Sequence, residues 1–131
     1  MTKKTVRILF TKSEQDAHDR GIRYVISKLR DAGNEVIYTN FLYPEEIANT
    51  AIQEDVDIIG LSSSTLGHMP VLRQLKPLLS EQGREDILII VGGIIPDDDH
   101  EELSKMGITG IFGPGTGTDD IKKFISDNLQ P

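Results

Sequence analysis

The sequence has 131 residues, 37% hydrophobic and 27% charged, a composition typical of one folded domain, expected over residues 1–131. It contains no cysteine, which excludes a disulfide framework and a thiolate metal site, and its net charge of −7 with 5% aromatic residues disfavours nucleic acid and anionic membranes as partners. No apolar run reaches transmembrane length and no signal peptide precedes the first polar residues, so a cytoplasmic location is expected.

Five short apolar runs alternate with helical patterns along the chain. The predicted strands are VRILF (6–10), EVIY (35–38), DIIGL (57–61), ILIIV (87–91) and GIF (110–112). Apolar residues recur at helical spacing after each strand: Ile22, Val25, Ile26 and Leu29; Ile47, Ala48, Ala51 and Ile52; Leu72, Leu75, Leu78 and Leu79; Leu103 and Met106; Ile121, Phe124, Ile125 and Leu129. Gly33 and Asn34 indicate the end of the first helix, and Pro44 suits the first position of the second. Strands that are apolar on both faces predict a parallel sheet covered by helices on each side.

Five strand-helix units with right-handed crossovers predict an α/β fold of the flavodoxin-like, doubly wound type. The expected order of the five parallel strands is 2-1-3-4-5. Ligands of such folds bind beyond the carboxyl ends of the strands, at the switch between the first and third strands. The candidate site is therefore expected in the loops at that edge.

Three of the four loops near this edge consist almost wholly of small or turn-forming residues. They are SSSTLGH (62–68), GGIIP (92–96) and GPGTGT (113–118). Small side chains let a ligand lie directly on the backbone, whose N–H groups then act as donors. Tight turning and helix capping explain each loop taken alone. Three such loops on one edge predict a long, narrow slot.

The fourth loop, TKSEQDAHDRG (11–21), carries His18. Asp16 lies two residues earlier and can accept the proton of one ring nitrogen, which directs the other nitrogen toward a metal. Alternatively, Asp16 or Asp19 caps the helix that follows. The other histidines, His68 and His100, lie in different segments, so a complete protein metal site is not predicted. One histidine suits a metal whose remaining ligands come from a macrocycle.

The spacing Asp16-x-His18-x-x-Gly21, followed by Ser62 and by the pair Gly92 and Gly93, resembles the DxHxxG…SxL…GG signature of base-off, His-on cobalamin-binding domains. The strings HDRG, VGGIIP and IFGPGT are similar to the cobalamin domain of the acyl-CoA mutases, such as methylmalonyl-CoA mutase and 2-hydroxyisobutyryl-CoA mutase. The resemblance covers nearly the whole chain.

The sequence departs from the family pattern at two points. Ala17 stands where many relatives have glycine before the histidine. The SxL element, aligned from Ser62, reads Ser-Ser-Ser, whereas a literal match begins at Ser64 and ends at Leu66. Either Ser62 or Ser64 is therefore expected to meet the cofactor.

The resemblance implies adenosylcobalamin as the cofactor. It makes His18 the lower axial ligand of cobalt and Asp16 the group that orients it. The other residues implied to bind the cofactor are Asp19, Arg20 and Gly21 near the corrin, and Ser62, Ser64, Leu66, Gly92, Gly93, Gly113, Gly115 and Thr116 around the displaced nucleotide tail.

The implied function is that of an isomerase subunit, the small cobalamin-binding subunit of an acyl-CoA mutase that catalyses a radical carbon-skeleton rearrangement. The substrate domain of this family resembles a (β/α)8 barrel, which needs about 250 residues. A separate large subunit is therefore expected to bind the acyl-CoA, and this chain is expected to hold no catalytic residue beyond the cofactor ligand.

Other functions remain open at this point. The small subunit of glutamate mutase shares the signature, and a corrinoid carrier or sensor does too, although those proteins usually carry a helical cap where this chain has only residues 1–5. A phospho-receiver needs an aspartate after the third strand and a lysine after the fifth, where the sequence has Ser62 and Gly113. A flavin carrier needs aromatic residues that are scarce in these loops.

Overall fold

The computed structural model describes residues 5–13, 20–63, 68–93, 95–108, 110–112 and 117–129, and at positions 20, 21, 63 and 129 only the backbone. The strands are β1 (Arg7–Ser13), β2 (Glu35–Phe41), β3 (Ile58–Ser63), β4 (Leu88–Gly93) and β5 (Gly110–Phe112). The helices are α1 (Arg20–Asp31), α2 (Pro44–Gln53), α3 (His68–Glu81), α4 (Asp97–Lys105) and α5 (Thr118–Leu129). All neighbouring strands are parallel and their order is β2-β1-β3-β4-β5, so the predicted fold is confirmed.

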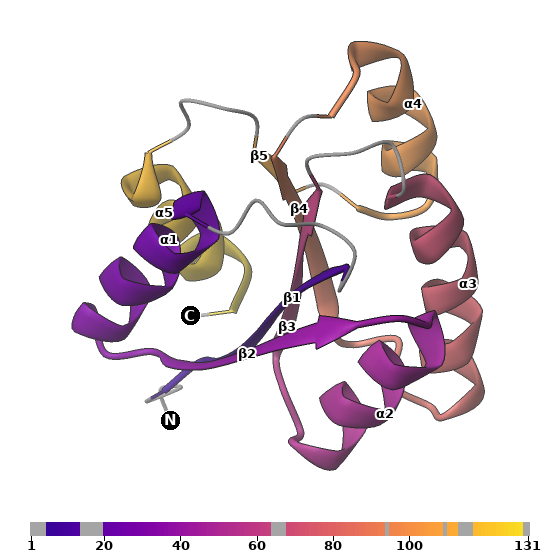
Figure 1. Ribbon diagram of the computed structural model, residues 1–131, viewed down its shortest axis with the longest axis horizontal. Coiled ribbons are helices and arrows are strands. Elements are labelled where there is room, and N and C mark those ends of the chain that lie inside the picture. The colour runs from indigo at the N-terminus through magenta and orange to yellow at the C-terminus, as the bar shows by residue number, and fades with distance from the viewer. Residues whose placement is uncertain are drawn as a thin grey trace.

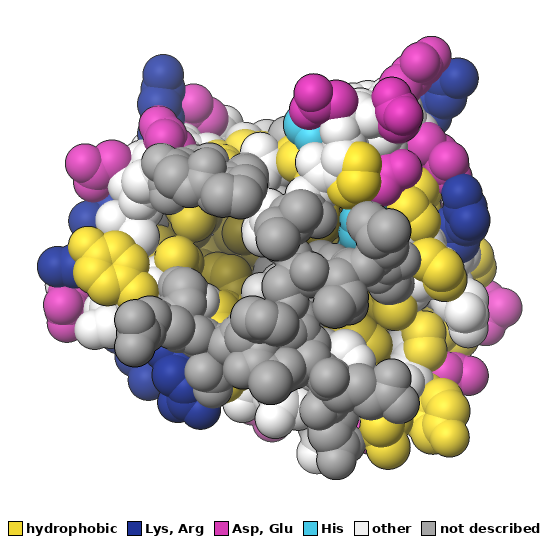
Figure 2. Space-filling model, turned by 45° about the horizontal axis from the view of Figure 1, so that its top comes forward, with side chains coloured by type: hydrophobic (Ala, Val, Ile, Leu, Met, Phe, Trp, Pro, Cys, Tyr) yellow, Lys and Arg dark blue, Asp and Glu magenta, His cyan; other side chains and the backbone are white. Residues whose placement is uncertain are grey.

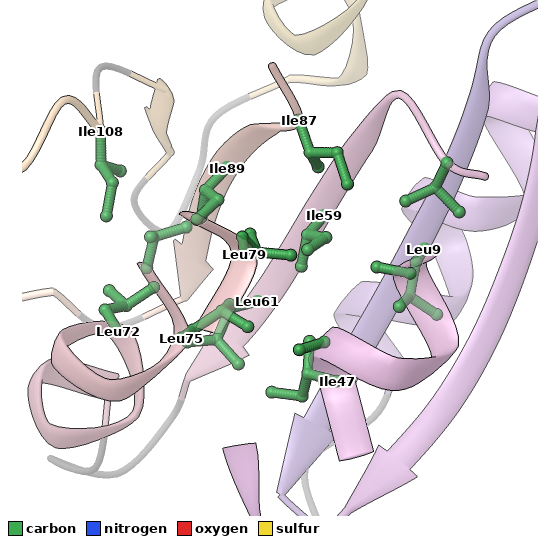
Figure 3. Close-up of a cluster of buried hydrophobic side chains, with 14 of the residues drawn as sticks. Leu9, Ile47, Ile59, Leu61, Leu72, Leu75, Leu79, Ile87, Ile89 and Ile108 are labelled. Atoms are coloured by element: carbon green, nitrogen blue, oxygen red, sulfur yellow. The ribbon is translucent and has the colours of Figure 1, made fainter. Parts of the chain in front are cut away.

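The helices form two layers around the sheet. Helices α1 and α5 lie together on one face, and α2, α3 and α4 lie on the other (Figure 1). Strand residues alternate between these layers. Leu9 and Ile59 belong to the core beneath α2 and α3, which Figure 3 shows in close-up, whereas Ile8 and Ile58 belong to the core beneath α1 and α5.

The helix boundaries follow the local signals in the sequence. Helix α1 ends at Asp31, and Gly33 has a φ of +98°, a conformation that favours glycine after a helix. Pro44 is the first residue of α2, where its missing N–H leaves no hydrogen bond unmade. One carboxylate oxygen of Glu46 accepts the backbone N–H groups of Leu42 at 2.7 Å and of Tyr43 at 2.8 Å.

Four strands are longer than the sequence predicts at their carboxyl ends. The predicted loops began at residues 11, 62 and 92, but Ser13, Ser63 and Gly93 still belong to β1, β3 and β4. Strand β2 likewise continues to Phe41 instead of Tyr38. Backbone ladder bonds do not require apolar side chains, so polar residues and glycines extend the sheet as long as a neighbouring strand pairs with them. The extension carries part of the candidate slot onto rigid strands.

Candidate functional site

The parallel register aligns residues from four strands in rows across the face covered by α1 and α5. One row consists of Phe10, Gly60, Ile90 and Gly110. The next row toward the carboxyl ends, called the edge row here, consists of Lys12, Ser62, Gly92 and Phe112. The edge row therefore has a serine and a glycine between two large side chains.

The glycines of the inner row are packing positions. A Cβ atom on Gly60 would lie 2.6 Å from the ring of Phe10, and a Cβ atom on Gly110 would overlap the side chain of Ile90. Neighbouring side chains therefore already fill the space that these glycines leave. Neither glycine offers room for a ligand.

Gly92, in the edge row, differs from both. Among the described residues, the only atom within 4 Å of a Cβ atom built on Gly92 is the carbonyl oxygen of Phe112, at an ordinary contact distance of 3.5 Å. Among the described residues, no side chain therefore lies over the backbone of Gly92. Gly93, the next residue, has a φ of +106°, which L side chains rarely adopt. The last residue of β4 therefore has a conformation that favours glycine.

A hollow opens at this edge of the molecule. Figure 2 brings the carboxyl edge forward and shows the hollow on the side of α1 and α5, with hydrophobic side chains at its floor. Phe112 belongs to this face, and its ring packs edge-on against that of Phe124 in α5, with centroids 5.8 Å apart. An apolar floor beside a serine hydroxyl and bare backbone fits an elongated group with an aromatic, partly polar tail.

Lys12 places a positive charge at the end of the edge row. The residue is only 6% exposed, and its Nζ atom lies 3.4 Å from the carbonyl oxygen of Ser13. Lysine is rarely so deeply buried, because a buried charge is costly unless it is paired and hydrogen-bonded. The sequence predicts a loop at this position and does not point to Lys12. Extending the strand alternation from Phe10 by two residues puts it on this face.

A buried pair lies where α3 and α4 begin. The side chain of His68 is 1% exposed, and its Nε2 atom lies 2.8 Å from Oδ2 of Asp99 in the first turn of α4. His68 is the first residue of α3, whereas the sequence predicts a loop there and no metal site at this histidine. No local pattern identifies this pair, because its members are 31 residues apart.

Part of the predicted site lies on the described backbone. Residues Ser62 and Gly92 are partners in the β3–β4 register, as are positions 63 and 93, so Ser62, Gly92 and Gly93 come together as predicted. The backbone of Arg20 and Gly21 lies in the first turn of α1. The predicted residues that lie outside the described residues are Asp16, His18, Asp19, Ser64, Leu66, Gly113, Gly115 and Thr116.

The described residues hold no group of three or more His, Asp or Glu side chains that could bind a metal ion. Over that same part of the chain, no helix is long and apolar enough to cross a membrane.

Doubly wound α/β domains bind ligands at the carboxyl edge of the sheet, and the hollow with its apolar floor lies at that edge, which is typical of a ligand-binding module. The family model described as B12 binding domain matches residues 6–121, and the chain therefore belongs to the B12-binding domains. The resemblance inferred from the sequence is confirmed.

The sequence relatives of this B12-binding domain are acyl-CoA mutases and a mutase small subunit. The chain is 42% identical to the 2-hydroxyisobutanoyl-CoA mutase small subunit of Aquincola tertiaricarbonis, covering 96% of both chains. It is 41% identical to the methylmalonyl-CoA mutase of Cereibacter sphaeroides and 42% identical to that of Escherichia coli, over 95% and 93% of this chain. The chain spans only 18% of the length of each of these two mutases.

Solved structures share the fold at low sequence identity. A cobalamin-binding protein from Desulfitobacterium hafniense superimposes with a TM-score of 0.73 at 20% identity, covering 92% of this chain and 60% of that one. The chemotaxis protein CheY4 of Vibrio cholerae superimposes with a TM-score of 0.71 at 17% identity, covering 95% and 99%. These similarities establish the flavodoxin-like architecture alone.

Proposed function

We propose that the chain is the small, cobalamin-binding subunit of an adenosylcobalamin-dependent acyl-CoA mutase of the 2-hydroxyisobutyryl-CoA or methylmalonyl-CoA type. The observation that carries the proposal is the full-length similarity to a mutase small subunit, at 42% identity over 96% of both chains. When bound, adenosylcobalamin supplies the organic radical that starts a carbon-skeleton rearrangement. The chain's own task is to hold the cofactor.

His18 is the proposed lower axial ligand of cobalt, and Asp16 is proposed to accept the proton on its other ring nitrogen. Both residues lie between Ser13, where β1 ends, and Arg20, where α1 begins. Strand β1 pairs with both β2 and β3, so this loop leaves the sheet at the switch point where ligands of doubly wound folds bind. Asp19, Arg20 and Gly21 are proposed to border the corrin.

The edge row is the proposed binding site of the nucleotide tail. The open space over Gly92 would receive the tail, and the half-buried hydroxyl of Ser62 lies next to it as a hydrogen-bonding group. Lys12 adds a positive charge at one end of this row. The remaining residues proposed to contact the tail are Gly93, Ser64, Leu66, Gly113, Gly115 and Thr116.

A large subunit with a (β/α)8 barrel is the proposed partner, and it would bind the acyl-CoA substrate. The net charge of −7 disfavours binding of the CoA phosphates to this chain. Neither nucleic acid nor membrane is a proposed partner. The complex is proposed to act in the cytoplasm.

An electron paramagnetic resonance experiment tests the proposed ligand. The Co(II) form of cobalamin is added to the purified chain, which is prepared once with natural histidine and once with ¹⁵N-labelled histidine. We expect the nitrogen coupling of the axial ligand to change with the label and to vanish in His18→Ala. His100→Ala, which changes an exposed histidine in α4, is the matched control and should keep the coupling. A label-independent spectrum would show that the ligand is not a histidine.

The activity is tested with the reconstituted complex. The chain alone should not isomerise any acyl-CoA, and it should restore turnover when added to a matching large subunit and adenosylcobalamin. Parallel assays with 2-hydroxyisobutyryl-CoA, methylmalonyl-CoA and glutamate separate the mutase classes. Turnover of glutamate alone would assign the chain to glutamate mutase, and turnover by the isolated chain would refute the division of labour between the subunits.

A further inference from the structure

His68 and Asp99 tie together the starts of two helices that follow neighbouring strands. His68 is the first residue of α3, which follows β3, and Asp99 lies in the first turn of α4, which follows β4. Because an ionised carboxylate only accepts hydrogen bonds, Nε2 carries the proton and donates to Oδ2 of Asp99 over 2.8 Å. The histidine side chain is 1% exposed and the aspartate side chain 28%.

The hydrogen bond between His68 and Asp99 lies beyond the last residues that pair β3 with β4. In the described residues, β3 and β4 pair as far as positions 63 and 93. The two chain segments then leave the sheet, and α3 begins at His68 and α4 at Asp97. The sheet fixes the spacing of the two chain segments at positions 63 and 93, and the contact between His68 and Asp99 fixes it again where the helices begin. The hydrogen bond between His68 and Asp99 joins those helix starts directly.

A second contact between the same helices shows why the buried pair matters more. Nη2 of Arg73 in α3 lies 2.6 Å from Oε2 of Glu102 in α4, but these side chains are 55% and 46% exposed. Water and salt screen an exposed ion pair, so its contribution is small. The buried imidazole is shielded from water, so its hydrogen bond to Asp99 is screened less than the exposed ion pair.

The pair lies on the opposite side of the sheet from the edge row. His68 is followed by Met69 and Leu72, which pack into the core beneath α2 and α3, whereas the edge row faces α1 and α5. The pair therefore does not line the hollow. Its effect on a ligand would come from the spacing of the starts of α3 and α4, which follow the strands that carry Ser62 and Gly92.

We propose that His68 and Asp99 are positioning residues that hold the starts of α3 and α4 at the spacing required by the nucleotide tail of cobalamin. The inference rests on the proposed cobalamin function and adds a role for two residues outside the family signature. Under this proposal, the pair affects the affinity of the chain for the nucleotide tail of the cofactor and does not affect its affinity for the corrin.

Cobinamide, the corrinoid that lacks the nucleotide tail, separates these two affinities. Dissociation constants of cobalamin and cobinamide are measured for the unmodified chain and for His68→Ala, Asp99→Ala and the double variant. We expect cobalamin affinity to fall by about tenfold, the lower end of what a lost supporting partner costs a site. Cobinamide affinity should stay constant. The double variant should bind no worse than the single variants, because both remove one interaction.

Conservative and neighbouring substitutions provide the controls. Asp99→Asn keeps an oxygen that accepts the Nε2–H hydrogen bond and should retain most of the affinity. Asp98→Ala removes an exposed carboxylate from the same turn of α4, so it matches the change in charge and should bind cobalamin normally. The side chain of Asp99 is partly exposed, so its variants test the inference even where His68→Ala fails to fold.

Two different failures can be told apart. If the unmodified chain binds no cobalamin, the proposed function is wrong, and this inference is wrong with it. If folded pair variants bind cobalamin normally, or lose cobalamin and cobinamide equally, only the positioning role is wrong. Thermal unfolding of each variant establishes that it is folded.

Discussion

Ser62 at the end of β3 stands opposite Gly92 at the end of β4 in the parallel register, on the face that α1 and α5 cover. The pairing places a hydroxyl beside backbone with no side chain above it. Both residues belong to strands whose inner residues are completely buried or nearly so, which makes this part of the channel rigid before any ligand binds. A rigid site avoids the entropy cost of ordering loops on binding.

Filling the channel should reduce binding without unfolding the protein. Gly92→Leu adds a side chain where, among the described residues, a Cβ atom meets only the carbonyl oxygen of Phe112, at a backbone position that needs no positive φ. We expect cobalamin affinity to fall by at least tenfold, a loss of about 1.4 kcal/mol. Thermal unfolding of the variant should match that of the unmodified chain.

Gly60→Ala is the contrasting variant, one row further into the sheet. Its Cβ would meet the ring of Phe10 at 2.6 Å, so it should destabilise the fold by about 1–3 kcal/mol and leave binding by the folded fraction unchanged. If Gly92→Leu and Gly60→Ala behave alike in both measurements, the distinction between an open and a filled glycine is wrong.

Replacement of Gly93 should cost stability for a conformational reason. Its φ of +106° is strained for any L side chain, so Gly93→Ala should destabilise the fold by about 1–3 kcal/mol. Chemical denaturation measures the loss. Gly92→Ala, one residue earlier, should cost less, and an equal cost at both positions would contradict the conformational argument.

The buried lysine should matter for binding more than for folding. Lys12→Met keeps the length of the side chain and removes the charge, so we expect weaker cobalamin binding with little loss in the free energy of unfolding. Lys12→Arg keeps the charge and is the matched control. The two properties are read by titration with cobalamin and by denaturant unfolding. A Lys12→Met variant that binds normally would make Lys12 a structural residue only.

The start of α2 should weaken in acid. The backbone N–H groups of Tyr43 and Leu42 donate to Glu46 and hold the pKa of its carboxyl below the ordinary value of 4.5. A carboxylate with a lowered folded-state pKa adds stability that is complete above the unfolded pKa and is lost as pH falls through the folded pKa. The loss should therefore appear below pH 4.5, in denaturant unfolding measured from neutral pH downward.

Glu46→Gln should flatten this part of the pH profile. Glu45→Gln removes a neighbouring charge from the same first turn of α2 but not these two hydrogen bonds, so it should keep the profile. Identical profiles for the two variants would show that the charge near the helix start, and not the hydrogen bonds, stabilises α2.

The fold could be predicted from the sequence because its evidence is local. Runs such as 87–91 are apolar at every position, which identifies buried parallel strands, and the number of strand-helix units then limits the topology. The strand ends could not be predicted in the same way. Thr11, Lys12 and Ser13 continue β1 because β2 pairs with them, and pairing is not visible in one strand.

The candidate site was predictable only in part. A motif at fixed spacing brought Ser62, Gly92 and Gly93 into the prediction, and the register confirms that they lie together. The difference between Gly92 and Gly60 depends on which side chain stands across the sheet, and the contact of His68 with Asp99 depends on two separate helix starts. Such relationships arise from tertiary packing, which the spacing of residues along the sequence does not reveal.

The contact between Phe10 and Gly60 makes the two positions interdependent. The ring of Phe10 occupies the place of a side chain at position 60, so a larger residue at 60 requires a smaller one at 10. Phe10→Leu should therefore relieve much of the destabilisation caused by Gly60→Ala. Natural variants of this domain are expected to exchange volume between these two strands, and substitution at one position without the other is expected to be rare.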